Sequence, residues 1–189
     1  MKNLFIVILV ALNFSGLAAQ NFFELDKSPL DMVYYPNDYA HDRRFAPQRI
    51  GSDTAMIRVI YSRPAKNGRE LLGKLIPYGK VWRTGANEAT EIKFYRDLLF
   101  GGMELKAGTY ALFTIPETNE WTIILNSALD HWGAYSYKAE QDVLRIKVPV
   151  RTNTKTLENF SIVFEKVDDK NAIMYLGWDT LLVSIPIGL

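Results

Sequence analysis

The chain has 189 residues, of which 48% are hydrophobic and 23% are charged. This composition supplies a packed core and excludes a disordered or collagen-like chain. Lys and Arg number 22 against 21 Asp and Glu, so net charge does not draw the chain to nucleic acid or to anionic lipid. Cysteine is absent, which excludes disulfides, thiolate metal ligands and thiol nucleophiles.

Residues 1–19 have the pattern of a secretory signal peptide. Lys2 precedes an uncharged apolar run, and the small residues Gly16 and Ala18 follow that run. The run is shorter than the roughly 20 apolar residues of a membrane-spanning helix. We therefore expect an exported protein, periplasmic or extracellular, with no membrane span in its mature form. An uncleaved membrane anchor is the alternative.

Residues 20–49 differ in character from the rest of the mature chain. They contain three prolines, scattered charges and several tyrosines, and no period of 2 or 3.6 persists. This pattern predicts an extended N-terminal arm with local turns. The aromatic residues indicate that parts of the arm dock on the following domain.

Residues 50–189 show the alternation of apolar and polar residues that is typical of half-buried strands. The segment 127–138 contains Gly133 and several aromatics, which favours a loop or a single turn over a helix. Strands separated by Gly and Pro turns, without crossover helices, predict one all-β domain. We expect an antiparallel β-sandwich, with a jelly-roll-like or barrel-like arrangement as the alternative. The expected strands are residues 54–61, 90–95, 109–115, 120–126, 143–148, 160–164, 172–178 and 181–187.

The segment 80–90 breaks this alternation and is rich in polar side chains. Arg83 offers a planar fork of donors, while Asn87 and Glu88 offer acceptors. Trp82 offers a flat face for stacking. These residues predict a pocket for a small polar ligand. The alternative is that Arg83 pairs with Glu88 and Asn87 satisfies the loop backbone.

A second candidate, segment 130–137, places a histidine beside aromatic residues. His131 is more simply explained as structural than as catalytic. Trp132 and Tyr135 are expected either to form part of a binding surface or to cap the end of the core. Two arginines near an expected hairpin turn, Arg63 and Arg69, are expected to form a solvated rim rather than an anion site.

The standard catalytic motifs are absent, including nucleophile elbows, phosphate-binding loops and zinc-protease helices. Two histidines that lie ninety residues apart, at 41 and 131, do not make a histidine-rich metal site. A pair of carboxylates is available in principle, but Glu88 and Glu91 would point to opposite faces of one extended strand. We expect no metal and no cofactor.

Two runs, PYGKVWRTGANEAT at 77–90 and LKAGTYALFTIP at 105–116, together with WGAY at 132–135, resemble a known family. This family of secreted bacterial proteins is catalogued as domain of unknown function 2911. The resemblance covers about residues 54–187. It implies an exported or periplasmic β-rich protein of Bacteroidota or related bacteria, and it implies no established activity.

The sequence favours a non-catalytic module that binds a small polar or glycan-like ligand, or an envelope partner, and not nucleic acid. One alternative is a hydrolase or isomerase acting on exported sugars or peptides, with Glu88 as acid or base. The other is a structural envelope protein whose polar loop packs against the arm. The oligomeric state stays open. The expected ligand-binding residues are Trp82, Arg83, Asn87, Glu88, His131, Trp132 and Tyr135.

Overall fold

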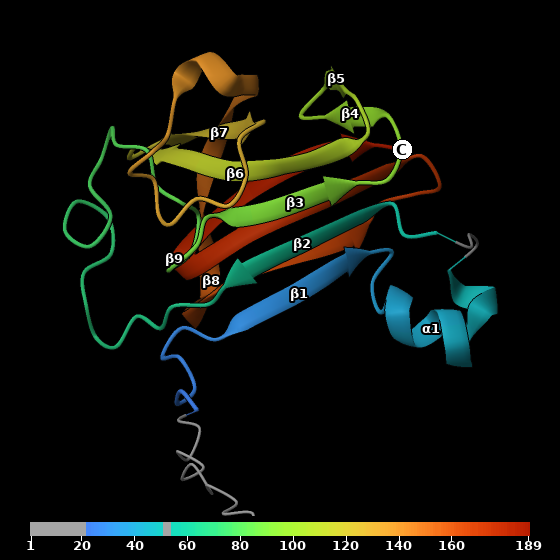
Figure 1. The fold of residues 1–189 in the computed structure, drawn as a ribbon, viewed down its shortest axis with the longest axis horizontal. Coiled ribbons are helices and arrows are strands. Elements are labelled where there is room, and N and C mark those ends of the chain that lie inside the picture. The colour runs from blue at the N-terminus through green and yellow to red at the C-terminus, as the bar shows by residue number, and fades with distance from the viewer. Residues whose placement is uncertain (1–21, 51–53) are drawn as a thin grey trace, which may run out of the picture.

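A computed structural model describes residues 22–50 and 54–189, so the expected signal peptide, residues 1–19, lies outside the described residues. Nine strands form one antiparallel sheet in the order β1-β2-β3-β6-β7-β8-β9-β4-β5 (Figure 1). The prediction of an all-β fold is therefore confirmed. No helix in the described part of the chain has the length and apolar character needed to cross a bilayer.

The strand positions agree with the alternation of the sequence over most of the domain. Short strands turn at glycine pairs, as at Gly101-Gly102, where both residues have positive φ. The strands are β1 (Leu30–Tyr35), β2 (Ile57–Ser62), β3 (Thr90–Phe94), β4 (Leu98–Phe100), β5 (Met103–Leu105), β6 (Gly108–Pro116), β7 (Glu120–Asn126), β8 (Asp142–Lys166) and β9 (Asn171–Gly188). The helical segments are α1 (Tyr39–Phe45), η1 (Pro47–Arg49) and η2 (Ala139–Gln141).

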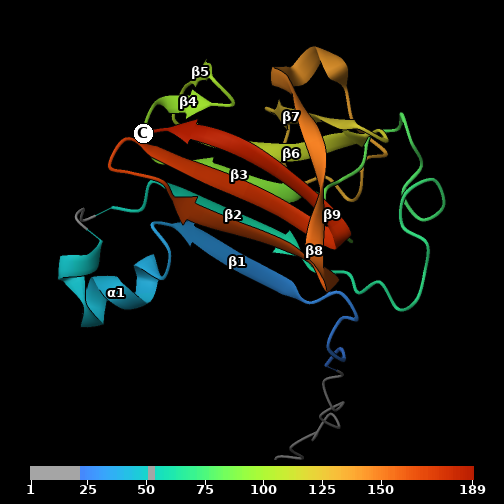
Figure 2. The ribbon, with the colours of Figure 1, turned by 180° about the vertical axis from the view of Figure 1, so that it is seen from behind.

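Strand β8 carries the sheet from one layer to the other. Its first part pairs with β7 and its second part with β9. β8 and β9 lie behind β1, β2 and β3 in Figure 1 and in front of them in Figure 2, which is seen from the opposite side. The sandwich is thus one sheet folded over on itself, and its two end strands, β1 and β5, do not pair to close a barrel.

The main core lies between these two layers. Alternate residues of β8, Phe160, Ile162 and Phe164, are buried, as the sequence predicts. They face apolar residues of the front layer, and the ring of Phe160 packs edge-on against Tyr61 of β2. Burying such side chains supplies most of the stability of a domain of this size.

The segment expected to be an extended arm is part of the fold. Residues 30–35 form β1, which pairs with β2 along its whole length. Residues 39–45 form α1, a helix that the sequence did not predict. A helix of seven residues spans about two turns, which is too short to show a clear period.

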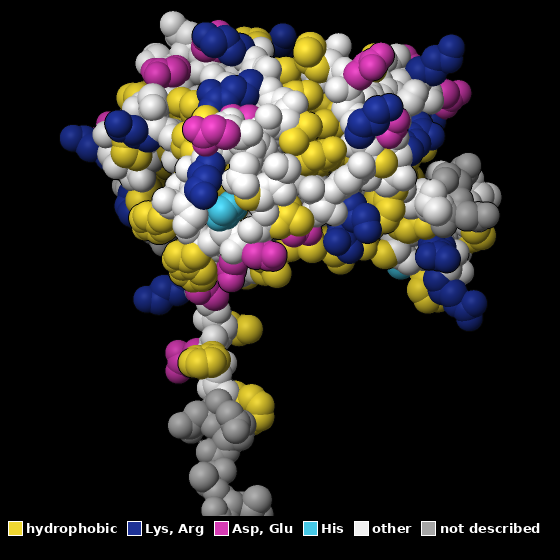
Figure 3. All heavy atoms as spheres, turned by 45° about the horizontal axis from the view of Figure 1, so that its top comes forward, with side chains coloured by type: hydrophobic (Ala, Val, Ile, Leu, Met, Phe, Trp, Pro, Cys, Tyr) yellow, Lys and Arg dark blue, Asp and Glu magenta, His cyan; other side chains and the backbone are white. Residues whose placement is uncertain are grey.

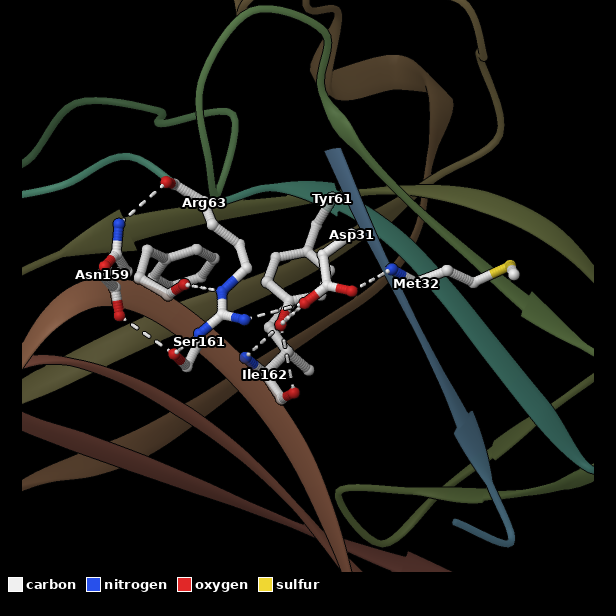
Figure 4. A network of polar contacts seen from close by, with 8 residues as sticks. Asp31, Met32, Tyr61, Arg63, Asn159, Ser161 and Ile162 are labelled. Atoms are coloured by element: carbon white, nitrogen blue, oxygen red, sulfur yellow. Dashed lines mark hydrogen bonds and ion pairs between the residues drawn. The ribbon is translucent and has the colours of Figure 1, made fainter. Parts of the chain in front are cut away.

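The free edge of β8, residues 160–164, is covered by side chains from the front layer (Figure 4). The Tyr61 hydroxyl donates to the Ile162 carbonyl at 3.3 Å and accepts from the Ile162 amide at 3.1 Å. Arg63 Nε donates to the Phe160 carbonyl at 3.1 Å. Asn37 Nδ2 donates to the Phe164 carbonyl at 2.9 Å. These bonds satisfy main-chain groups that have no strand partner on this side.

Arg63 and Arg69, the two arginines that were expected to form a solvated rim, bond to internal partners. Arg63 also forms an ion pair with Asp31 at 2.9 Å, and Asp31 accepts a hydrogen bond from the Met32 amide at 2.7 Å. Arg69 donates to the main-chain carbonyls of Ala65 and Lys66. The turn at Asn67-Gly68 forms with positive φ at both residues, but it lies in a long loop and not between paired strands.

Candidate functional site

A second, smaller core lies on the outer face of β6 and β7. Ala111 and Phe113 of β6 and Ile124 of β7 are buried there. Residues of the loop 127–138 cover them, among them Leu129, Ala134 and Tyr137. This packing holds the loop 127–138 against the front layer.

The end of this loop is fixed by polar contacts to the start of β8. The Tyr137 hydroxyl donates to Asp142 Oδ2 at 2.6 Å, and its ring packs edge-on against Phe113 at 5.2 Å. Asn126 Nδ2 donates to the Lys138 carbonyl at 3.0 Å and to Asp142 Oδ1 at 2.8 Å. Burial and the bond to Asp142 raise the pKa of Tyr137 to about 12.

Main-chain hydrogen bonds join the two polar segments that the sequence singles out. The Ala89 amide donates to the His131 carbonyl at 2.8 Å, and the Gly133 amide donates to the Asn87 carbonyl at 2.9 Å. Glu88 and Trp132 form an antiparallel bridge between them. Residues 87–89 and 131–133 are therefore held side by side.

The backbone before Asn87 is held in an unusual conformation. Thr84 is fully buried and has a φ of 57°, which is uncommon for a β-branched residue. Thr90 Oγ1 donates to the Thr84 carbonyl at 2.6 Å, and Thr84 Oγ1 donates to Thr114 Oγ1 at 3.2 Å. Such strain persists only where the surrounding contacts impose it, so the segment 83–90 is rigidly positioned.

A cavity of about 520 Å³ lies where these two loops meet the outer face of β1, β2 and β3. Four of the seven expected ligand-binding residues line it, namely Asn87, Glu88, His131 and Trp132. Trp132 is 60% exposed. The Nε2 atom of His131 is buried and has no hydrogen-bond partner in the described part of the chain. Figure 3 shows both acidic and basic side chains near a histidine on the face where the N-terminal segment joins the domain.

The other three expected residues do not line this cavity. Trp82 packs into the main core, where its ring stacks on Trp178 at a centroid distance of 6.0 Å. The Nε atom of Arg83 is buried and has no hydrogen-bond partner among the described residues, and its Nη1 atom lies close to Gly133. Tyr135 is 85% exposed.

The structure differs from two expectations that rested on the local sequence. The alternative ion pair between Arg83 and Glu88 is not among the ion pairs of residues 22–50 and 54–189. The expectation that Glu88 and Glu91 point to opposite faces is wrong, because both line the same cavity. Glu88 precedes β3, which begins at Thr90, so strand alternation does not apply to it.

The N-terminal segment and the outer face of the sheet also contribute to this cavity, which the sequence did not predict. Strand pairing over a long sequence separation brings these residues to the two loops, and no local pattern reveals that pairing. The residues concerned are Asp26, Ser28 and Leu30 of the N-terminal segment and Ile60, Tyr61, Ser62 and Glu91 of β2 and β3.

Among the described residues, no group of three or more His, Asp or Glu side chains is arranged to hold a metal ion.

A comparison with protein-family models matches residues 43–187 to a family described as Protein of unknown function (DUF2911). The chain belongs to the DUF2911 family. The DUF2911 match begins inside α1 and includes both loops of the cavity. Comparisons with curated proteins and with solved structures returned no match.

Proposed function

We propose that this chain is an exported protein that binds a small polar, glycan-like ligand in the cavity between the two loops, without catalysing a reaction on it. The observation that supports this proposal is the exposed ring of Trp132 beside Asn87 and Glu88 on one cavity wall. An aromatic face stacks on the apolar face of a sugar ring. Amide and carboxylate groups next to it accept hydrogen bonds from the sugar hydroxyls.

The size of the cavity favours a small ligand over a protein partner. Its volume of about 520 Å³ lies within the range of small-molecule sites. Asp26 and Ser28 of the N-terminal segment contribute to its lining, but Trp132 stays exposed. This arrangement gives less support to a structural protein in which the arm covers the polar loop.

The position of Glu88 favours binding over catalysis. A carboxyl group that acts as general acid is usually buried, since burial raises its pKa toward neutrality. Glu88 is exposed, and its side chain has no hydrogen-bond partner among the described residues. The geometry therefore gives no particular support to the hydrolase or isomerase. Export itself rests on the signal-peptide pattern of residues 1–19.

Isothermal titration calorimetry with β-1,4-linked tetrasaccharides tests the proposal. The proteins are the wild type, Trp132→Ala and the matched variant Tyr135→Ala, which removes an exposed ring of the same loop outside the cavity lining. We expect Trp132→Ala to bind about tenfold more weakly, a loss of about 1.4 kcal/mol, and Tyr135→Ala to bind like the wild type. Equal binding by both variants, or no binding of any tetrasaccharide by the wild type, would contradict the proposal.

A further inference from the structure

We propose, on the basis of the proposed function, that the ligand of this cavity carries a protonated amine, as an amino sugar does. The charges on the cavity wall lead to this inference. Its lining contains four carboxylates and neither lysine nor arginine, and the four are Asp26, Glu88, Glu91 and Asp130.

None of these four carboxylates has a cationic partner within the described residues. Elsewhere on the protein surface, acidic side chains such as Glu120 and Asp97 pair with lysines across neighbouring strands or turns. Carboxylates that share one hollow repel each other, and a bound cation relieves that repulsion. The hollow therefore selects for positive charge.

The apolar part of the lining fits the body of such a ligand. Leu30, Ile60 and Ala89 are the apolar aliphatic residues of the same lining. The face of Trp132 is available both for stacking on a sugar ring and for attracting an ammonium group. The buried Nε2 atom of His131, a residue that lines the cavity, has no hydrogen-bond partner within residues 22–50 and 54–189.

The cations closest in sequence do not change this balance. Lys27, Arg83 and Lys93 do not line the cavity. Lys93 is two residues from Glu91 on β3, but its ammonium group lies over the ring of Tyr95, 4.7 Å from the ring centroid. Arg63 forms its ion pair with Asp31 and its other hydrogen bonds with β8. An anionic ligand in this cavity would therefore face carboxylates without a basic side chain on the wall to bind it.

The test uses three tetrasaccharides with the same β-1,4 linkage that differ only at carbon 2. Cellotetraose carries a hydroxyl there, N-acetylchitotetraose an acetamide and chitosan tetraose an amine. At about pH 6 ordinary carboxyl groups are ionised. We expect calorimetry at that pH to give chitosan tetraose an affinity about tenfold above that of cellotetraose, the equivalent of two to three exposed ion pairs. This advantage should shrink in about 0.5 M NaCl, because salt screens exposed charges.

A pair of isosteric variants locates the effect in the cavity. Glu91→Gln removes one carboxylate from the lining, whereas Glu104→Gln removes the same charge from β5, outside the lining. We expect Glu91→Gln to lower the affinity for chitosan tetraose about three- to fivefold and to leave the affinity for cellotetraose unchanged. Glu104→Gln should change neither affinity.

The outcomes separate the two proposals. Equal affinity for all three tetrasaccharides, with the loss in Trp132→Ala retained, would overturn the amine inference and leave the glycan-binding proposal in place. Equal effects of Glu91→Gln and Glu104→Gln would also overturn the amine inference. Binding of none of the three would overturn both proposals.

Discussion

The hydroxyl of Tyr61 on β2 bonds to both main-chain groups of Ile162 on β8. The Tyr61 side chain thus forms the two main-chain hydrogen bonds that a neighbouring strand would otherwise form with Ile162 at the free edge of β8. Tyr61 is 3% exposed, and burial raises the pKa of its hydroxyl. The contact joins the front and back layers of the folded sheet at a point where no backbone ladder connects them.

Tyr61→Phe should therefore destabilise the protein. It leaves the Ile162 amide and carbonyl without partners in a buried position, which costs about 1–3 kcal/mol. The matched variant Tyr175→Phe removes an exposed hydroxyl that bonds to Glu165, and it should cost no more than about 0.5 kcal/mol. Urea unfolding of the two variants measures the difference. Equal losses would show that the Tyr61 hydroxyl does not join the layers.

The turn between β4 and β5 offers a second matched pair. Gly101 and Gly102 have φ values of 60° and 82°, so alanine is strained at either position. A Cβ at Gly101 would lie 2.1 Å from Ile146 Cδ1, whereas a Cβ at Gly102 meets nothing within 4 Å. We expect Gly101→Ala to lower the free energy of unfolding by about 1–3 kcal/mol more than Gly102→Ala. Chemical denaturation checks this order, and the reverse order would contradict the packing of this turn on β8.

Local alternation was sufficient to predict most of the fold. It predicted β6 and β7 closely and predicted which side of β8 is buried, because side chains of a strand alternate between faces. It divided β8 into two strands, since the polar residues between 150 and 158 lack an apolar face. It also missed β1, whose place in the sheet depends on pairing with β2.

The candidate site was predicted only in part. Asn87, Glu88, His131 and Trp132 belong to two segments whose polar and aromatic residues interrupt the strand alternation, so each segment could be recognised from its own sequence. Their joining depends on main-chain bonds between loops that are distant in sequence. Trp82 was expected to contact a ligand, but it packs against the main core. The sequence of a polar segment does not distinguish a tryptophan that binds a ligand from one that packs in the core.

The contact of Tyr137 with Asp142 predicts a pH dependence of stability. Burial, and next the bond to Asp142, raise the pKa of Tyr137 from 10.0 to about 12 in the folded protein. A group whose folded pKa is raised stabilises the fold below its unfolded pKa and loses that contribution as the pH rises to the folded pKa. The free energy of unfolding should thus fall more steeply between pH 10 and 12 in the wild type than in Tyr137→Phe. Parallel curves from denaturant titrations at several pH values would contradict this role of the hydroxyl.

The central claim is that a ligand occupies the cavity beside Trp132. The four tryptophans of the chain allow a site-specific readout, because Trp132 is 60% exposed whereas Trp121 and Trp178 are each 3% exposed. We propose to label the protein with 5-fluorotryptophan and to record fluorine NMR spectra during a titration with chitosan tetraose. The account predicts a saturable shift of the Trp132 resonance, assigned from its absence in Trp132→Ala, while the resonances of Trp121 and Trp178 stay in place. A titration in which the Trp132 resonance does not move would contradict it.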